Sequence, residues 1–305
     1  MKNQQVNLYN DVTHQFFANH PNVSSSNTDV VNQKNKLTKT KVVTQQSIEK
    51  ALHLFHSHGL NDLNAANLMN RVDSKFILPL SFLPDLLMQL KSYYTALEIN
   101  NNRISSYHNQ YFDTPEMALY HDHHNGKLNR YKVRRRSYVD TNTEFLEIKL
   151  KNNKKRTIKS RIQLTGHQNE YKQCAQFIDE HMQTNIKSLD VRQQGGYKRI
   201  ALANEAQAER LTLDFDLWYQ DRRGCNNVKL PEFFIAELKQ NKKSKQSPFY
   251  QLMCANNIFP TAFSKYCIGC ALLYKSSIKS NRFKAILSQL EKLNRTEQVS
   301  LLKSN

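Results

Sequence analysis

Residues 130–138 read Arg-Tyr-Lys-Val-Arg-Arg-Arg-Ser-Tyr, and the spacing of the charges indicates the secondary structure of this segment. Four of its basic side chains have the same parity: Arg130, Lys132, Arg134 and Arg136. On a β-strand all four project from one face, about 7 Å apart along the strand. The segment therefore predicts a strand with one strongly cationic face.

Other segments also alternate with a period of two. Four of them place charged residues on one face and apolar residues on the other, at residues 71–78, 144–151, 210–218 and 234–239. Four further candidates are less regular: the segment 130–138 itself and residues 107–113, 159–164 and 197–202. About eight strands with few helices between neighbours favour an α+β fold built on an antiparallel sheet. We expect an eight-stranded closed barrel, or tunnel, with flanking helices.

Helical periodicity occurs in four places. The helices are predicted at residues 46–58, 81–94 (with Ser81 as the cap), 170–182 and 282–302. Residues 1–45 are polar, lack a sustained period, and are predicted to be a disordered lead-in. The predicted organisation is therefore a lead-in at 1–45, a tunnel domain at 46–280 and a C-terminal helix at 281–305.

The composition narrows the class of protein. The chain has 305 residues, and its 44 Lys and Arg against 26 Asp and Glu give a formal charge of +18. No apolar run approaches the roughly 20 residues of a membrane helix, and the N-terminus does not resemble a signal peptide. Five scattered cysteines argue against a disulfide scaffold. We predict a cytoplasmic protein with an anionic partner.

The charge is concentrated in residues 127–161, which contain 13 basic and three acidic side chains. Such a run is commonly a solvated face or a nucleic-acid patch. If the sheet closes, however, the cationic face lines a lumen, where unpaired cations are costly without an anionic guest or water. Arg and Lys suit a chain of phosphates, and carboxylates suit Mg²⁺ or Mn²⁺. On these grounds alone a phosphate-binding barrel and a nucleic-acid surface stay open.

Ten short motifs occur in one order across residues 60–275. They are Arg71-x-Asp73-x-Lys75, Tyr111-Phe-Asp-Thr-Pro115, Tyr120-x-x-His123-x-x-Gly126, Arg130-x-Lys132-x-Arg134-x-Arg136-x-Tyr138, Leu146-Glu-Ile-Lys149, Lys159-x-Arg161, Tyr197-x-Arg199, Arg210-x-Thr212-x-Asp214, Glu237-x-Lys239 and Ser264-Lys-Tyr266. This order resembles the vacuolar transporter chaperone type of polyphosphate polymerase domain. That family belongs to the triphosphate tunnel metalloenzymes, which have an eight-stranded antiparallel tunnel.

The resemblance implies an enzyme that transfers the γ-phosphoryl group of ATP onto inorganic polyphosphate. It implies catalytic roles for Lys239, Lys265, Arg134 and Arg136. It implies phosphate binding by Arg71, Lys75, Lys132, Lys149, Lys159, Arg161, Tyr197, Arg199 and Arg210. The implied ligands of a divalent Mn²⁺ or Mg²⁺ are Glu237, Glu147 and Asp214. Product export would need a separate membrane or regulatory partner, and no nucleic acid is expected to bind.

Some features favour plainer interpretations. Relatives usually carry Glu at the position of Asp73, so a metal ligand there would be weaker, or Asp73 only holds its neighbours. The run His121-Asp-His-His124 is not expected to bind a metal, because successive side chains point in different directions. Cys267 and Cys270 are expected to pack a helix. The tract 151–156 is expected to be a solvated hairpin loop, with guidance of a polyanion as the alternative.

Other functions stay possible on the same residues. A triphosphatase needs the same cationic cage and metal, so the sequence separates it poorly from a polymerase. A non-catalytic polyanion-binding module needs the cations but not Glu237. A nucleic-acid binder would place its basic residues without regard to strand parity, and the strict alternation at 130–136 argues against it.

Overall fold

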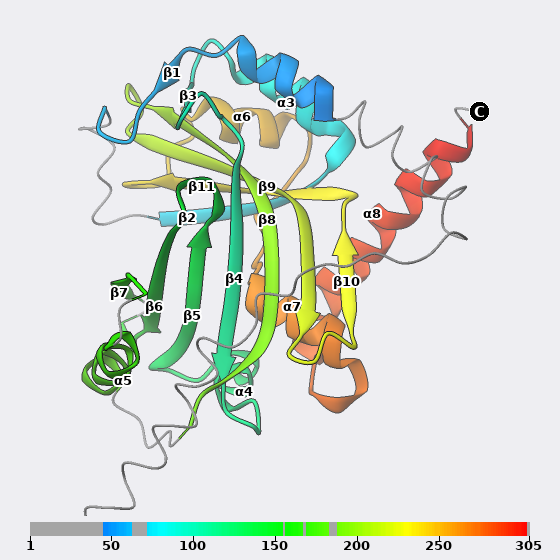
Figure 1. The fold of residues 1–305 in the computed structure, drawn as a ribbon. Helices are drawn as coiled ribbons and strands as arrows, with labels where there is room; N and C mark the ends of the chain where they lie inside the picture. Colours follow the sequence, from blue (N-terminus) through cyan, green and yellow to red (C-terminus); the bar gives the residue numbers. More distant parts are fainter. Residues whose placement is uncertain (1–44, 63–71, 155, 167–168, 183–187, 304–305) are drawn as a thin grey trace, which may run out of the picture.

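The computed structural model describes residues 45–62, 72–154, 156–166, 169–182 and 188–303, with side chains described as far as residue 294. The predicted lead-in, apart from Gln45, lies outside the described residues, and so does the predicted phosphate ligand Arg71. The fold is α+β, with one strongly curled sheet and helices on its outer side (Figure 1).

The sheet has the strand order β2-β11-β9-β8-β4-β5-β6-β7, and every neighbouring pair along this path is antiparallel. These eight strands are β2 (Val72–Pro79), β4 (Ser105–Asp113), β5 (Arg130–Tyr138), β6 (Thr143–Lys151), β7 (Thr157–Leu164), β8 (Asp190–Asn204), β9 (Glu209–Asp221) and β11 (Phe233–Gln240). All eight predicted strands are therefore confirmed. The short strands β1 (Ser57–His58), β3 (Thr95–Leu97) and β10 (Asn227–Leu230) are additional.

The prediction of a closed barrel is wrong for the described residues. No backbone pairing joins the two edge strands β2 and β7 in this part of the chain. Instead, the free edge of β2 is met by the segment before α7 (Lys265–Tyr274), because the Thr261 amide donates to the Lys75 carbonyl oxygen at 2.7 Å. The curl still brings both edges to one place, since Lys75 of β2 and Lys159 of β7 line the same cavity.

Irregularities in the long strands account for part of the curl. The register between β8 and β9 shifts between Gly196 and Lys198, and such bulges bend a strand and increase its twist. Gly196 is required there, because a Cβ atom on it would lie 2.5 Å from the indole nitrogen of Trp218. At the same register shift, Asp216 of β9 has a φ of 54°, in the left-handed region. The strand β8 extends further than the predicted residues 197–202. The prediction was short because residues 190–196 contain two glycines and lack sustained alternation of polar and apolar residues.

Helices cover the apolar outer face in separate groups. The helix at 45–53, α3 (Leu83–Leu90) and α6 (Pro248–Ala255) pack on β2, β11, β9 and β8 in one core (Figure 1). The helix α5 (Glu170–His181) packs with its Cys174 and Phe177 against β5 and β6. The helices α7 and α8 (Lys284–Lys303) pack against β9, β10 and β11. The helix α4 (Ala118–Asn125) contacts α7 and β5.

The predicted helices are confirmed in place, with shifted ends. The first ends at residue 53, not 58, because Ser57 and His58 form β1 beside β3. The second begins at Leu83 after a 3₁₀ turn, so Ser81 is not its cap. The third and fourth match α5 and α8 within a few residues.

Within the described residues, no helix has both the length and the apolar character that crossing a membrane requires.

Candidate active site

The cationic face of the sheet encloses a cavity of about 280 Å³. Nine of the described residues that line it are basic: Lys75, Lys132, Arg134, Arg136, Lys149, Lys159, Arg199, Lys239 and Lys265. The acidic lining residues are Asp73, Asp214 and Glu237, and the fully buried Glu147 pairs with two of the basic lining residues, Arg134 and Lys159. The cavity therefore carries a clear excess of positive charge, which favours a polyanionic guest.

Strand register sets the positions of the cations. Lys132, Lys149 and Lys159 are directly opposite one another on β5, β6 and β7. Like charges in directly opposite positions destabilise a sheet. Three lysines in one row are therefore a cost that a bound anion would relieve.

Glu147 anchors one pair of cations at the base of the cavity. Its side chain is fully buried, and one oxygen accepts from Arg134 Nε at 2.7 Å and Arg134 Nη2 at 2.5 Å. The other oxygen lies 2.5 Å from Lys159 Nζ. The carboxylate thus holds two cations from strands on either side of β6.

Asp214 and Glu237 anchor two more pairs in the same way. Asp214 is 2% exposed and accepts from Arg199 Nε at 2.5 Å and from Lys265. Glu237 lies 3.2 Å from Lys75 Nζ and 2.8 Å from Lys239 Nζ, with 18% of its side chain exposed. Each carboxylate therefore holds two cations, and Glu237 is the most accessible of the three.

The pKa values follow from these pairs. Burial alone would raise the pKa of Glu147, but Arg134, Arg136 and Lys159 lower it strongly. The pKa of Asp214 and that of Glu237 are likewise lowered, because their paired cations outweigh burial. All three carboxylates are ionised at neutral pH, so each neutralises part of the cationic charge permanently.

Lys149 differs from its neighbours. Among the described residues it forms neither a hydrogen bond nor an ion pair, and it faces Arg134, Arg136 and Lys159. The positive charge of Arg134 and then burial hold the pKa of Lys149 well below its ordinary value. Burial also lowers the pKa of Lys132, whose Nζ donates to Ser264 Oγ at 2.9 Å. Lys149 is therefore the cation with most to gain from a bound anion.

The first turn of α7 closes one side of the cavity. Ser264 caps the helix by accepting from the Cys267 amide at 3.2 Å, and Lys265 follows directly, with its Nζ 4.4 Å from the centroid of the Tyr197 ring. A helix N-terminus favours anions, because its first N–H groups have no partner within the helix. The side chain of Lys265 and the start of α7 thus add to the positive potential.

The first turn of α7 is positioned by a buried carboxylate, Asp113, which was not among the predicted site residues. Asp113, at the end of β4, accepts from the Leu119 and Tyr120 amides at 2.8 Å and from the hydroxyl of Tyr266. The Tyr266 ring stacks on Tyr111, with centroids 5.1 Å apart. Asp113 therefore ties α4 and α7 together beside the cavity. Its place in the Tyr111–Pro115 motif was the available signal.

Most predicted site residues line this cavity. They are Lys75, Lys132, Arg134, Arg136, Lys149, Lys159, Tyr197, Arg199, Asp214, Glu237, Lys239 and Lys265. Glu147 is not among the lining residues, but it forms ion pairs with two of them, Arg134 and Lys159. Arg161 is exposed and lies over the Phe145 ring at 4.6 Å, and the positive charge of Arg210 adds to burial in lowering the pKa of His58. Neither is among the residues that line the cavity.

The oxygen donors fit a divalent metal only in part. No group of three or more acidic, His or Cys side chains is poised for a metal in the described part of the chain. Mg²⁺, however, is commonly held by one or two carboxylates together with substrate phosphates. Glu237 and Asp73 line the cavity on the neighbouring strands β11 and β2, and they supply such oxygens. Glu147 and Asp214 are almost fully buried, whereas Glu237 keeps part of its side chain exposed, so Glu147 and Asp214 fit less well.

The structure also places the cysteine pair, the histidine run and the tract 151–156, for which plainer roles were predicted. Cys267 and Cys270 are buried on α7, as expected for packing residues. His123 and His124 hydrogen-bond to Tyr131 O and to Asn281 Oδ1, respectively. The tract 151–156 connects β6 to β7; Lys151, Asn153, Lys154 and Arg156 are exposed, and Asn152 is half-buried.

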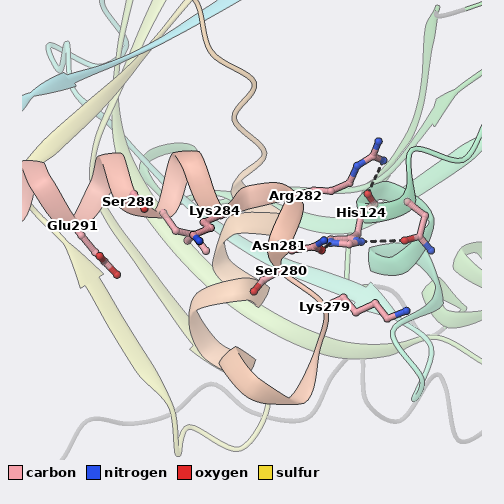
Figure 2. Close-up of a pocket in the computed structure, with 10 residues that line it drawn as sticks. His124, Lys279, Ser280, Asn281, Arg282, Lys284, Ser288 and Glu291 are labelled. Carbon is pink, nitrogen blue, oxygen red and sulfur yellow. Dashed lines mark hydrogen bonds between the residues drawn. The ribbon is translucent and has the colours of Figure 1, made fainter.

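A second, more open cavity of about 1030 Å³ lies between the end of α4 and the start of α8. Figure 2 shows Asn281 facing His124, and Arg282 reaching the His124 carbonyl, to which it donates at 2.9 Å. Lys279 and Lys284 point to different sides of this cavity (Figure 2). None of its lining residues was predicted as a site residue.

Comparison with known proteins gives one family and several distant structures. No curated protein matches the chain. A putative adenylyl cyclase from Hippeastrum, described as having a dominant triphosphatase activity, aligns with a TM-score of 0.40 and 13% identity, over 67% of this chain and 96% of that one. A putative adenylate cyclase from Vibrio parahaemolyticus aligns with a TM-score of 0.39 and 12% identity, over 65% and 97%.

A conserved hypothetical protein from Pyrococcus furiosus aligns with a TM-score of 0.36 and 11% identity, over 64% of this chain and 98% of that one. All three scores are too low to assign a fold or an activity. The family model is decisive, because the VTC domain matches residues 70–274, well over half of the sequence. This chain therefore belongs to the VTC domain family.

Proposed function

We propose that the protein is a polyphosphate polymerase, which transfers the γ-phosphoryl group of ATP onto inorganic polyphosphate. Membership of the VTC domain family supports a function on a chain of phosphates. The observation that carries the proposal is the cavity itself, where nine cations from six strands and the start of α7 surround one space. Positioning and charge neutralisation are what phosphoryl transfer chiefly needs.

The paired cations have a defined part in this reaction. A terminal oxygen of polyphosphate attacks the γ-phosphorus, the bond from that phosphorus to the β,γ-bridging oxygen breaks, and ADP leaves with the electron pair. Lys239 and Lys265 carry charge toward the reacting phosphates, and Arg134 and Arg136 offer N–H groups to the chain. Glu237 and Asp73 would hold a divalent cation, which supplies further neutralisation of phosphate oxygens when bound.

The test is incubation of the purified protein with ATP and either Mn²⁺ or Mg²⁺, followed by sizing of the product on a gel. The expected product is a long polymer that a phosphatase degrades. The Glu237→Ala variant is expected to form none. Hydrolysis of tripolyphosphate without polymer would instead assign a triphosphatase to the same cavity. Salt-sensitive polyphosphate binding without turnover, unaffected by Glu237→Ala, would assign a binding module.

A further inference from the structure

The two ends of the cationic face carry different chemistry. Toward the start of β5, the row of Lys132, Lys149 and Lys159 contains only lysines. Toward the end of β5, aromatic rings take their place on the same face. These rings belong to Tyr107, Tyr138 and Phe145, and the exposed Arg161 lies beside them. We call these four residues the aromatic end.

The rings of the aromatic end form a continuous, half-buried group. The centroids of Tyr107 and Tyr138 are 5.1 Å apart, and those of Tyr138 and Phe145 are 5.8 Å apart, edge to face. Arg161 covers Phe145 at 4.6 Å from the ring centroid. Tyr138 and Phe145 both keep part of their surface open. Partly exposed rings and an exposed guanidinium at the edge of a cationic site are suited to a planar, partly apolar group.

The aromatic end is continuous with the cavity. Arg136, which lines the cavity, has its guanidinium 5.4 Å from the Tyr107 centroid and 6.0 Å from that of Tyr138. Tyr197, also in the lining, stacks on Tyr107 at 5.1 Å with the ring planes 8° apart. Tyr138 lies about 7 Å beyond Arg136 along β5. A ribose and its glycosidic bond can span such a distance from a phosphate held by Arg136.

We propose that Tyr138, Phe145 and Arg161 form a stacking site for a nucleobase, so that a nucleoside triphosphate binds with its base at the aromatic end and its phosphates in the cavity. This inference rests on the proposed function, because it assigns an orientation to the donor. Aromatic rings and Arg guanidinium groups bind the faces of all bases without reading their edges. The site therefore favours nucleotides over bare phosphate chains, with little discrimination among purines.

The experiment is calorimetry with two ligands that are not turned over, the β,γ-imido analogue of ATP and imidotriphosphate, which has no base. Wild type is expected to bind the ATP analogue more tightly. The double variant Tyr138→Ala/Phe145→Leu is expected to lose about tenfold in affinity for the ATP analogue and to keep its affinity for imidotriphosphate. Retained imidotriphosphate binding also shows that the variant is folded. Tyr93→Ala, at a ring that is 57% exposed outside the cationic face, is the matched control.

Two results would overturn the stacking site while leaving the proposed function intact. In one, wild type binds the ATP analogue no more tightly than imidotriphosphate. In the other, the double variant loses affinity for both ligands equally, which would mean that the rings only support Arg136. If wild type bound neither ligand, the proposed function and the stacking site would both fail.

Discussion

Among the described residues, two cavities are lined by three or more basic residues, and they differ in enclosure. The cavity inside the sheet measures about 280 Å³, and its nine cations are interleaved with buried carboxylates. The cavity between α4 and α8 measures about 1030 Å³, but its Lys279, Arg282 and Lys284 are exposed and point apart. Exposed charges are screened by water and salt, whereas enclosed charges are screened much less. Enclosure, not volume or the presence of cations, therefore distinguishes the candidate active site.

The largest difference is expected in turnover. Lys239→Ala removes one cation of the enclosed set, and loss of one such charge commonly costs about 100-fold or more in kcat. Lys284→Ala removes an exposed cation at the other cavity and is expected to leave the rate within about twofold. Initial rates of polymer formation from ATP measure both. Equal effects of the two substitutions would remove the distinction between the cavities.

The next difference concerns stability. Glu147→Gln leaves the buried Arg134 without its carboxylate, and breaking such a pair costs about 3–5 kcal/mol. Glu291→Gln, at the exposed cavity, is expected to change the free energy of unfolding by less than about 0.5 kcal/mol. Urea unfolding followed by circular dichroism measures both values. A change below about 1 kcal/mol for Glu147→Gln would show that the enclosed charges are better hydrated than their burial indicates.

A smaller effect is expected around α4, which lines the open cavity at one end and is tied at the other through Asp113 to Tyr266 of α7. Asp113 binds the first turn of α4 and holds Tyr266 beside Lys265, whereas His124 at the other end faces Asn281. Tyr266→Phe removes the hydroxyl contact and is expected to lower kcat about tenfold, or about 1.4 kcal/mol, with the KM for ATP nearly unchanged. The reason is that Tyr266, without its contact to Asp113, no longer holds the neighbouring Lys265 in position.

His124→Gln is the matched change at the far end of α4, and no effect on kcat is expected from it. Steady-state kinetics on both variants, with thermal unfolding to confirm that they fold, separates positioning from stability. A rise in KM for Tyr266→Phe with an unchanged kcat would contradict a positioning role for the Asp113–Tyr266 contact.

The smallest expected effect is the uptake of protons when polyphosphate binds. The lowered pKa of Lys149 reflects the adjacent positive charge of Arg134 and burial. A bound phosphate chain stabilises the ammonium form, so its pKa rises and binding takes up protons at pH values above the lowered pKa. Calorimetry of polyphosphate binding in two buffers with different ionisation enthalpies is expected to show uptake of a fraction of a proton. Lys149→Met is expected to reduce this uptake, and the pKa values of Lys132, Lys159 and Lys239, which are also lowered, account for the remainder. Proton release by wild type would contradict this account.

Much of the fold was predictable from the sequence because it depends on local pattern. Strand parity placed Arg134 and Lys149 on the inner face, and helical spacing located α5 correctly. The ordered motifs were enough to identify the family. These signals need only neighbouring residues, because side-chain direction in a strand or helix follows from its period.

The tertiary structure alone decided which groups meet. No local pattern pairs Lys265 with Asp214, 51 residues away, or joins Asp113 to Tyr266, 153 residues away. The strands β2 and β7 do not pair, and the free edge of β2 is instead met by a distant segment, whose Thr261 amide donates to the Lys75 carbonyl oxygen. Parity fixes the face on which a charge lies, but the curl of the sheet and the docking of α7 fix its partner. The sequence by itself determined a cationic face, and the fold turned that face into an enclosed site with three carboxylate-anchored pairs.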